Sequence, residues 1–116
     1  MGISVLESSI VEYTDVTIPA NSLISNDAFL GGSTICGIYI PSVMTASTIS
    51  FLASHSQTNY VQVKTDTTVN FSKSIVANSY LPIAPADLVG INFFKISINT
   101  AQSAASTFKV VSRKIQ

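Results

Sequence analysis

Apolar and polar residues alternate one by one along several short segments of the chain. In the segment NFFKISIN (92–99), Phe94, Ile96 and Ile98 alternate with Lys95 and Ser97. This period of two is that of a β-strand with one face buried. Similar segments, rich in Val, Ile, Thr, Phe and Tyr, predict further strands. These are VEYTDVTI (11–18), TISFLAS (48–54), NYVQVKT (59–65) and TFKVVSRKI (107–115).

Two of the predicted strands depart from simple alternation. STICGIYI (33–40) is apolar on both faces over 35–40, which predicts a central strand covered on both sides. VEYTDVTI changes face partway, so we expect it to carry a bulge or to change role midway. Val11, Tyr13 and Asp15 lie on one face of this segment, whereas the apolar residues Val16 and Ile18 lie on the other.

Segments rich in Pro, Gly, Asn, Asp and Ser separate the predicted strands. About seven or eight short strands with such breaks between them predict an all-β fold, an antiparallel sandwich or barrel. Of these, we expect an antiparallel β-sandwich of jelly-roll type. We expect no substantial helix, only short helical turns at 42–47 and 85–89. The Gly31–Gly32 pair lacks the following lysine and helix of a phosphate-binding loop, and predicts a turn.

A long stretch of the chain carries no charge: no Lys, Arg, Asp or Glu occurs from Ala28 to Val63. A membrane-spanning helix needs about 18–20 mostly apolar residues in a row. The densest apolar run here, ICGIYIPSVM (35–44), is broken by Pro41 and Ser42, and Ser and Thr recur throughout the residues after it. We therefore expect strands with neutral polar faces and no membrane partner.

The composition limits the classes of partner. Six basic and six acidic residues cancel, and charged residues make up 10% of the 116 residues, against about 25% in an ordinary soluble protein. Neutral polarity comes instead from 18 Ser, 11 Thr and 7 Asn. The basic residues are scattered, so we expect no nucleic-acid partner. They are Lys64, Lys73, Lys95, Lys109, Arg113 and Lys114.

Few residue types that carry catalysis or bind metals are present. His55 is the only histidine and Cys36 the only cysteine. We expect His55 in an exposed turn and Cys36 as a small buried apolar residue. We predict no enzymatic activity, no cofactor and no metal site. The arrangements considered and set aside are a triad of His55, Cys36 and Asp66 or Asp87, and a Ca²⁺ site at Asp15 or Asp27.

A sugar-binding module is the main alternative, because such modules are often β-sandwiches rich in Ser, Thr and Asn. They normally display exposed aromatic rings on which sugars stack. Trp is absent here, and most aromatic residues fall at core-facing strand positions. Tyr39, Tyr60 and Tyr80 are the residues that could form surface platforms, although a buried tyrosine with a bonded hydroxyl is the commoner case.

The order of these segments resembles that of small β-sandwich proteins encoded beside the capsid genes of tailed bacteriophages. The segments concerned are IPANSLIS (18–25), the glycine turn, GIYIP (37–41), SVMTAS (42–47), TISFLAS and NYVQV (59–63), followed by LPIAPADLVGINFFKISI (81–98). Residues 1–15 lie outside the resemblance. The family often has an aromatic residue where Met44 stands, and an Asp-Gly turn where HSQTN (55–59) stands.

The resemblance implies a structural virion protein that decorates or cements the capsid exterior, made in the host cytoplasm. Its partners would be the major capsid protein and further copies of itself, with a trimer favoured. We divide the chain into 1–15, an N-terminal arm or first strand, and one sandwich domain, 16–116. Ile3, Val5 and Leu6 are the candidate partner contacts of the arm. An ordinary edge strand is the other interpretation of this segment. A receptor- or glycan-binding module of a phage fibre or tail is the alternative function.

Overall fold

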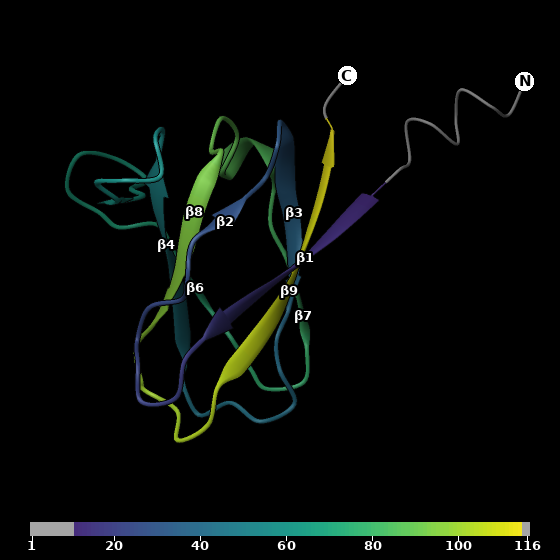
Figure 1. Ribbon diagram of the computed structural model, residues 1–116, viewed down its shortest axis with the longest axis vertical. Coiled ribbons are helices and arrows are strands. Elements are labelled where there is room, and N and C mark those ends of the chain that lie inside the picture. Colours follow the sequence, from purple (N-terminus) through teal and green to yellow (C-terminus); the bar gives the residue numbers. More distant parts are fainter. Residues whose placement is uncertain (1–10, 115–116) are drawn as a thin grey trace, which may run out of the picture.

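The computed structural model describes residues 11–114, which form two antiparallel β-sheets packed face to face (Figure 1). One sheet, here called sheet A, has the strand order β1-β9-β3-β7. Its strands are β1 (Val11–Ile18), β9 (Ser106–Lys114), β3 (Ser33–Tyr39) and β7 (Tyr80–Pro82). One 3₁₀ turn, η1 (Pro85–Asp87), precedes the return of the chain to the other sheet.

The other sheet, sheet B, has the order β2-β8-β4-β5, and β6 also pairs with β4. Its strands are β2 (Ala28–Phe29), β8 (Phe93–Ile98), β4 (Thr48–Ser54), β5 (Val61–Gln62) and β6 (Ser72–Ser74). Every strand pair in both sheets is antiparallel. The predicted sandwich is therefore confirmed.

The order in which the strands pair is that of a jelly roll. Strands from the two ends of the described chain pair first, β1 with β9 and β2 with β8, and strands nearer its middle pair next, β3 with β7 and β4 with β5 and β6. Successive pairs fall alternately in sheet A and sheet B. This is a long antiparallel hairpin rolled around the core, as in two-sheet jelly rolls.

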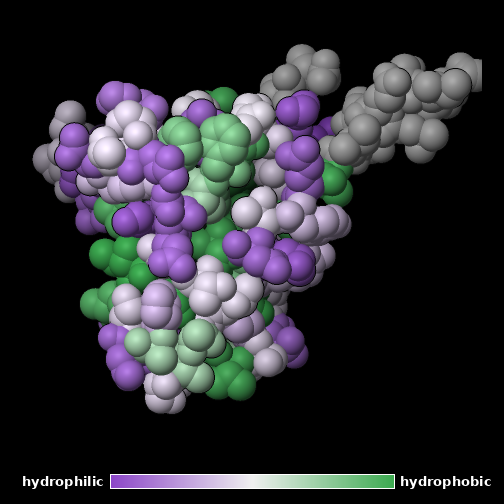
Figure 2. All heavy atoms as spheres, in the orientation of Figure 1, coloured by the Kyte–Doolittle hydropathy of each residue, from purple (hydrophilic) through white to green (hydrophobic). Residues whose placement is uncertain are grey.

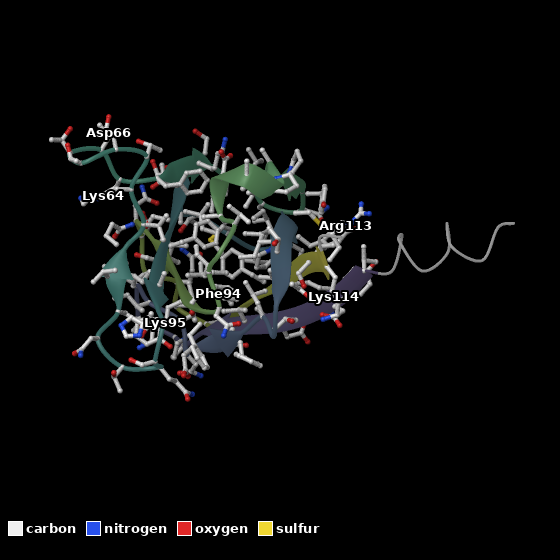
Figure 3. The ribbon with its side chains drawn as sticks, turned by 90° about the horizontal axis from the view of Figure 1, so that it is seen from above. Lys64, Asp66, Phe94, Lys95, Arg113 and Lys114 are labelled. Atoms are coloured by element: carbon white, nitrogen blue, oxygen red, sulfur yellow. The ribbon has the colours of Figure 1, made fainter. Side chains whose placement is uncertain are left out.

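The alternating strands supply the core between the sheets. Phe94 points into the interior while its neighbour Lys95 points away from it (Figure 3). Phe51 of β4 and Phe108 of β9 are, like Phe94, fully buried. Ile18, Ile38 and Ile98 pack in the same cluster. Each buried phenylalanine or isoleucine contributes about 1.5–3 kcal/mol relative to an exposed one, so the core explains why the fold needs no disulfide.

The charge-free stretch becomes two strands in different sheets, β3 and β4, joined across the end of the sandwich. β4 has the bounds that alternation predicted. β3 lies between β9 and β7, as expected of a central strand. The register of β3 shifts between Ile35 and Gly37, so the bulge lies in this strand. β1 pairs residue by residue with β9 and contains no bulge. Of the two expectations for this strand, the second holds: its first residues are exposed, whereas Val16 and Ile18 are buried.

Three local expectations have different outcomes. The helical turn expected at 85–89 is present at Pro85–Asp87, whereas 42–47 contains no helical turn. NYVQVKT forms only the two-residue strand β5, and Val61 is 65% exposed. This strand pairs only with Leu52 and Ala53 of β4 at the edge of sheet B, and Val61 is not buried as the alternation predicted. Residues 11–15, which we assigned to the N-terminal arm or first strand, are the first five residues of the eight-residue strand β1.

Within residues 11–114, no helix is long and apolar enough to cross a membrane. The charged residues are spread over both sides of the molecule. Lys64 and Asp66 stand in the β5–β6 loop on one side of the molecule, whereas Arg113 and Lys114 end β9 on the other (Figure 3). Lys109 forms an exposed 2.9 Å ion pair with Asp15 of β1, and pairs of this kind contribute about 0–1 kcal/mol.

We predict that the backbone amides of β3 exchange with solvent slowly. Both neighbours of β3 are hydrogen-bonded strands, and Ile35 and Ile38 are fully buried. Opening this strand therefore requires much of the sandwich to open. Hydrogen–deuterium exchange followed by NMR measures this directly. Amides of β5, a two-residue edge strand, provide the fast-exchanging comparison, and equally fast exchange in β3 would contradict the architecture.

Candidate binding surfaces

The residues considered for catalysis or metal binding lie in separate parts of the sandwich. His55 is exposed in the loop after β4, as expected. Cys36 is half-buried at the β3 bulge, less buried than predicted, with its Sγ 3.5 Å from the carbonyl oxygen of Val111. Asp87 ends η1. Within the described residues, no three His, Cys, Asp or Glu side chains are grouped so that they could hold a metal ion.

Two loop aspartates make hydrogen bonds within the protein. Oδ1 of Asp66 accepts hydrogen bonds from the backbone N–H groups of Thr68 (2.8 Å) and Val69 (3.1 Å). These bonds stabilise the charged form and hold the pKa of Asp66 below its usual value. Asp27 accepts a 2.7 Å hydrogen bond from the side-chain amide of Gln57, which lowers its pKa in the same way. Both carboxylates thus organise loops.

A pair of aromatic residues, exposed Phe29 and half-buried Phe93, lies on the outer face of sheet B. Phe29 of β2 stands opposite Phe93 of β8, with ring centroids 4.9 Å apart. Phe29 is 56% exposed. Figure 2 shows apolar residues gathered on the surface over the upper ends of β2 and β8. We call Phe29, Phe93 and the exposed Val89 the phenylalanine patch.

A shallow hollow of about 690 Å³ adjoins the phenylalanine patch. It is lined by Phe29 and Val89, by the start of β3 and by the 90–92 segment that leads into β8. Gly31 and Gly32 form the predicted turn at its border, both with positive φ, which residues with a side chain adopt rarely. A second hollow, of about 560 Å³, lies on the other side of the 90–92 segment and includes His55. This end of the sandwich is therefore uneven and partly apolar.

A second aromatic group lies on the outer face of sheet A. Tyr39 of β3 stands opposite Tyr80 of β7, and their ring centroids are 4.7 Å apart. Tyr13 of β1 pairs with Val111 of β9, which is flanked on its other side by Gly37 of β3. The three tyrosines are 57% (Tyr13), 48% (Tyr39) and 43% (Tyr80) exposed. We call these three residues the tyrosine patch.

Gly37 allows the ring of Tyr80 to lie against β3. A Cβ atom at this glycine would stand 1.8 Å from the Tyr80 hydroxyl oxygen and 2.3 Å from Cζ. The Tyr80 hydroxyl donates a 3.4 Å hydrogen bond to the carbonyl oxygen of Cys36. Partial burial raises the pKa of Tyr80, and Cys36, Tyr39 and Tyr13 contribute in that order. Val111, on the outward face, is only 6% exposed because this group of side chains covers it.

Of the three tyrosines predicted as surface platforms, the structure brings two together. Tyr60 lies elsewhere and is half-buried, with the ammonium nitrogen of Lys95 4.6 Å from its ring centroid. Burial and the charge of Asp27 raise the pKa of Tyr60. Tyr13 was not predicted as a surface platform. Its position on the exposed face of VEYTDVTI was the feature of the sequence that could have indicated it.

The chain is similar in fold to a protein of solved structure, the SPBc2 prophage-derived protein YomS. The TM-score is 0.56 with 16% sequence identity, over 90% of this chain and 95% of the other. This likeness shows the fold. Comparisons with protein-family models and with curated protein sequences found no match. The predicted arm contacts Ile3, Val5 and Leu6 lie outside the described residues.

Proposed function

We propose that this chain is a structural virion protein of a tailed phage that decorates or cements the capsid exterior. The observation that carries the proposal is the jelly-roll fold shared, over nearly the whole of both chains, with a prophage-derived protein. The order of strand and turn segments in the sequence supports the same assignment. In this proposal the major capsid protein is the partner, and the work is done by binding alone.

The phenylalanine patch is our candidate surface for docking on the capsid. Exposed apolar patches on soluble proteins commonly mark protein–protein contacts. Phe29 and Val89 are large, apolar and more than half exposed. The low charge of the chain favours such contacts, since few charged groups lose their hydration when the surfaces meet. A capsid presents the same site many times by symmetry, which favours a symmetric oligomer, with a trimer our first expectation.

Saturable binding of the purified chain to assembled capsids tests the proposal. Cosedimentation measures the bound fraction, and analytical ultracentrifugation measures the oligomeric state. We expect Phe29→Ala to weaken capsid binding at least tenfold, because a central aromatic anchor commonly dominates an interface. Val43→Ala is the matched control, since Val43 is 77% exposed and outside the patch.

Two outcomes would count against this function. A strict monomer that does not bind capsids would contradict the proposal as a whole. Saturable capsid binding that is equally strong in Phe29→Ala and in the wild type would leave the virion function standing and move the docking surface elsewhere. Circular dichroism and thermal melting of both variants exclude unfolding as the cause of a loss.

A further inference from the structure

A small hollow of about 270 Å³ opens beside the tyrosine patch. Tyr39 and Ile40, at the end of β3, form one side, and Asn78, Ser79 and Tyr80, at the start of β7, form the other. The hollow is on sheet A, apart from the phenylalanine patch on sheet B. Its small volume fits one ring-sized ligand, since sites for drug-sized molecules occupy about 300–1,000 Å³.

The backbone around this hollow is fixed by hydrogen bonds. The N–H of Ile40 donates to the carbonyl oxygen of Ser79 at 2.7 Å, and the N–H of Asn78 donates to that of Pro41 at 2.8 Å. The Ser79 hydroxyl donates to the carbonyl oxygen of Val76 at 2.5 Å. Asn78 itself has a φ of 58°, a left-handed conformation that asparagine tolerates better than most residues. The two walls are thus held in place before any ligand arrives, which reduces the entropy lost on binding.

The side chains around the hollow combine aromatic rings with neutral hydrogen-bonding groups. Tyr39 and Tyr80 are each nearly half exposed. The Asn78 side chain is exposed, and its side-chain amide has no hydrogen-bond partner among the described residues. That amide offers two N–H donors and one carbonyl acceptor. Within residues 11–114, no charged side chain lines the hollow. This lining suits a neutral ligand with hydroxyl groups better than a phosphate, a carboxylate or a cation.

We propose that this hollow binds one neutral sugar ring. A pyranose has a face of C–H groups, which carry slight positive charge, and the face of an aromatic ring is negative. Tyr39 and Tyr80 would contact that C–H face, and Asn78 would hydrogen-bond to the ring's hydroxyls. The inference does not depend on capsid binding, because the residues involved are separate from the phenylalanine patch.

NMR titration of the ¹⁵N-labelled chain with neutral methyl glycosides tests the proposal. The probes are the methyl glycosides of glucose, galactose, mannose and N-acetylglucosamine, each raised to tens of millimolar. We expect at least one of them to shift the amide signals of Tyr39, Asn78, Ser79 and Tyr80 saturably. A single ring in an open hollow should give a dissociation constant of about 1 mM or weaker, within the efficiency limits of small ligands.

Variants connect the expected shifts with the hollow. Tyr80→Ala removes one ring and should weaken the binding at least tenfold. Asn78→Gly should also weaken it, and glycine keeps the left-handed backbone that Asn78 adopts. Phe29→Ala is the matched control, since it removes an aromatic ring from the opposite sheet and should leave sugar binding unchanged. Conversely, Tyr80→Ala should still bind capsids if the proposed function holds.

Three results would overturn the sugar site. The first is the absence of any saturable shift at these amides with all four glycosides. The second is a shift that persists unchanged in both folded variants, Tyr80→Ala and Asn78→Gly. The third is a concentration-dependent shift of the same amides without sugar, with no further change on adding glycoside, because a second copy of the chain then covers the face.

Discussion

Phe94→Ala is expected to lower the free energy of unfolding by about 3–5 kcal/mol. Phe94 is fully buried near the start of β8, where it stands between Ala28 of β2 and Ala53 of β4. Removing the ring loses the free energy gained by burying its apolar surface. It also leaves a cavity that the surrounding strands fill only in part. A domain of this size has a total stability of about 5–15 kcal/mol, so the variant would lose a large share of it.

Urea denaturation followed by circular dichroism measures this effect as a lower midpoint. Phe29→Ala is the matched control: it removes the same side chain from the neighbouring strand, but its ring is 56% exposed. We expect this control to lose less than about 1 kcal/mol, as surface substitutions usually do. Equal losses in the two variants would mean that Phe94 does not occupy the core position described here.

Ser25→Ala is expected to lower the free energy of unfolding by about 1–3 kcal/mol, although it removes a single oxygen atom. Ser25 is 4% exposed, and its hydroxyl oxygen accepts a 2.9 Å hydrogen bond from the backbone N–H of Ile96. The same hydroxyl donates to the carbonyl oxygen of Asn26 at 2.7 Å. β2 pairs with β8 only at 93–94, so Ser25 supplies the acceptor that a longer strand would have provided. Alanine leaves the Ile96 N–H buried without that acceptor.

The matched control for this prediction is Ser22→Ala. Ser22 lies three residues earlier in the same loop, and its hydroxyl is exposed where it accepts from the N–H of Ile24 at 3.3 Å. Water replaces such a partner easily, so we expect a loss of at most about 0.5 kcal/mol. The difference between the two midpoints in urea isolates the buried bond. A Ser25→Ala variant as stable as Ser22→Ala would show that water reaches the Ile96 amide.

The alternation of apolar and polar residues predicted the central strands because these strands bury one face in the core. TISFLAS has a buried face with Ile49 and Phe51, and its pattern marks both of its ends. The number of strands and the breaks between them predicted an antiparallel sandwich or barrel, whereas the order in which the strands pair was not predicted from these features. Segments without a buried apolar face show no such alternation, so their pairing was not predicted. Residues 19–27 fall between predicted strands, yet Ile24 bridges Ser97 of β8 and the Ser25 hydroxyl accepts from the Ile96 N–H. A single serine in a loop segment gives no sequence pattern from which such a hydrogen bond could be predicted.

The binding surfaces were predictable only in part, because they depend on which strands become neighbours. Tyr39 and Tyr80 were both singled out, but they are 41 positions apart, and only the pairing of β3 with β7 places their rings in contact. Gly37 gave no local signal of its role under Tyr80. The phenylalanine patch was missed because most aromatic residues in the strands were assigned to the core. Phe29 lies on a strand of two residues, too short to show alternation.

The pairing of β1 with β9 has a consequence for biosynthesis. These two strands are joined over eight consecutive residue pairs, from Val11 with Arg113 to Ile18 with Ser106. A ribosome releases β1 long before β9 has been made, so sheet A cannot close until β9 follows. Contacts between such distant positions also form slowly. Until β9 is made, the β-prone, uncharged segment 33–40 lacks one of its partner strands and is open to pairing with other chains.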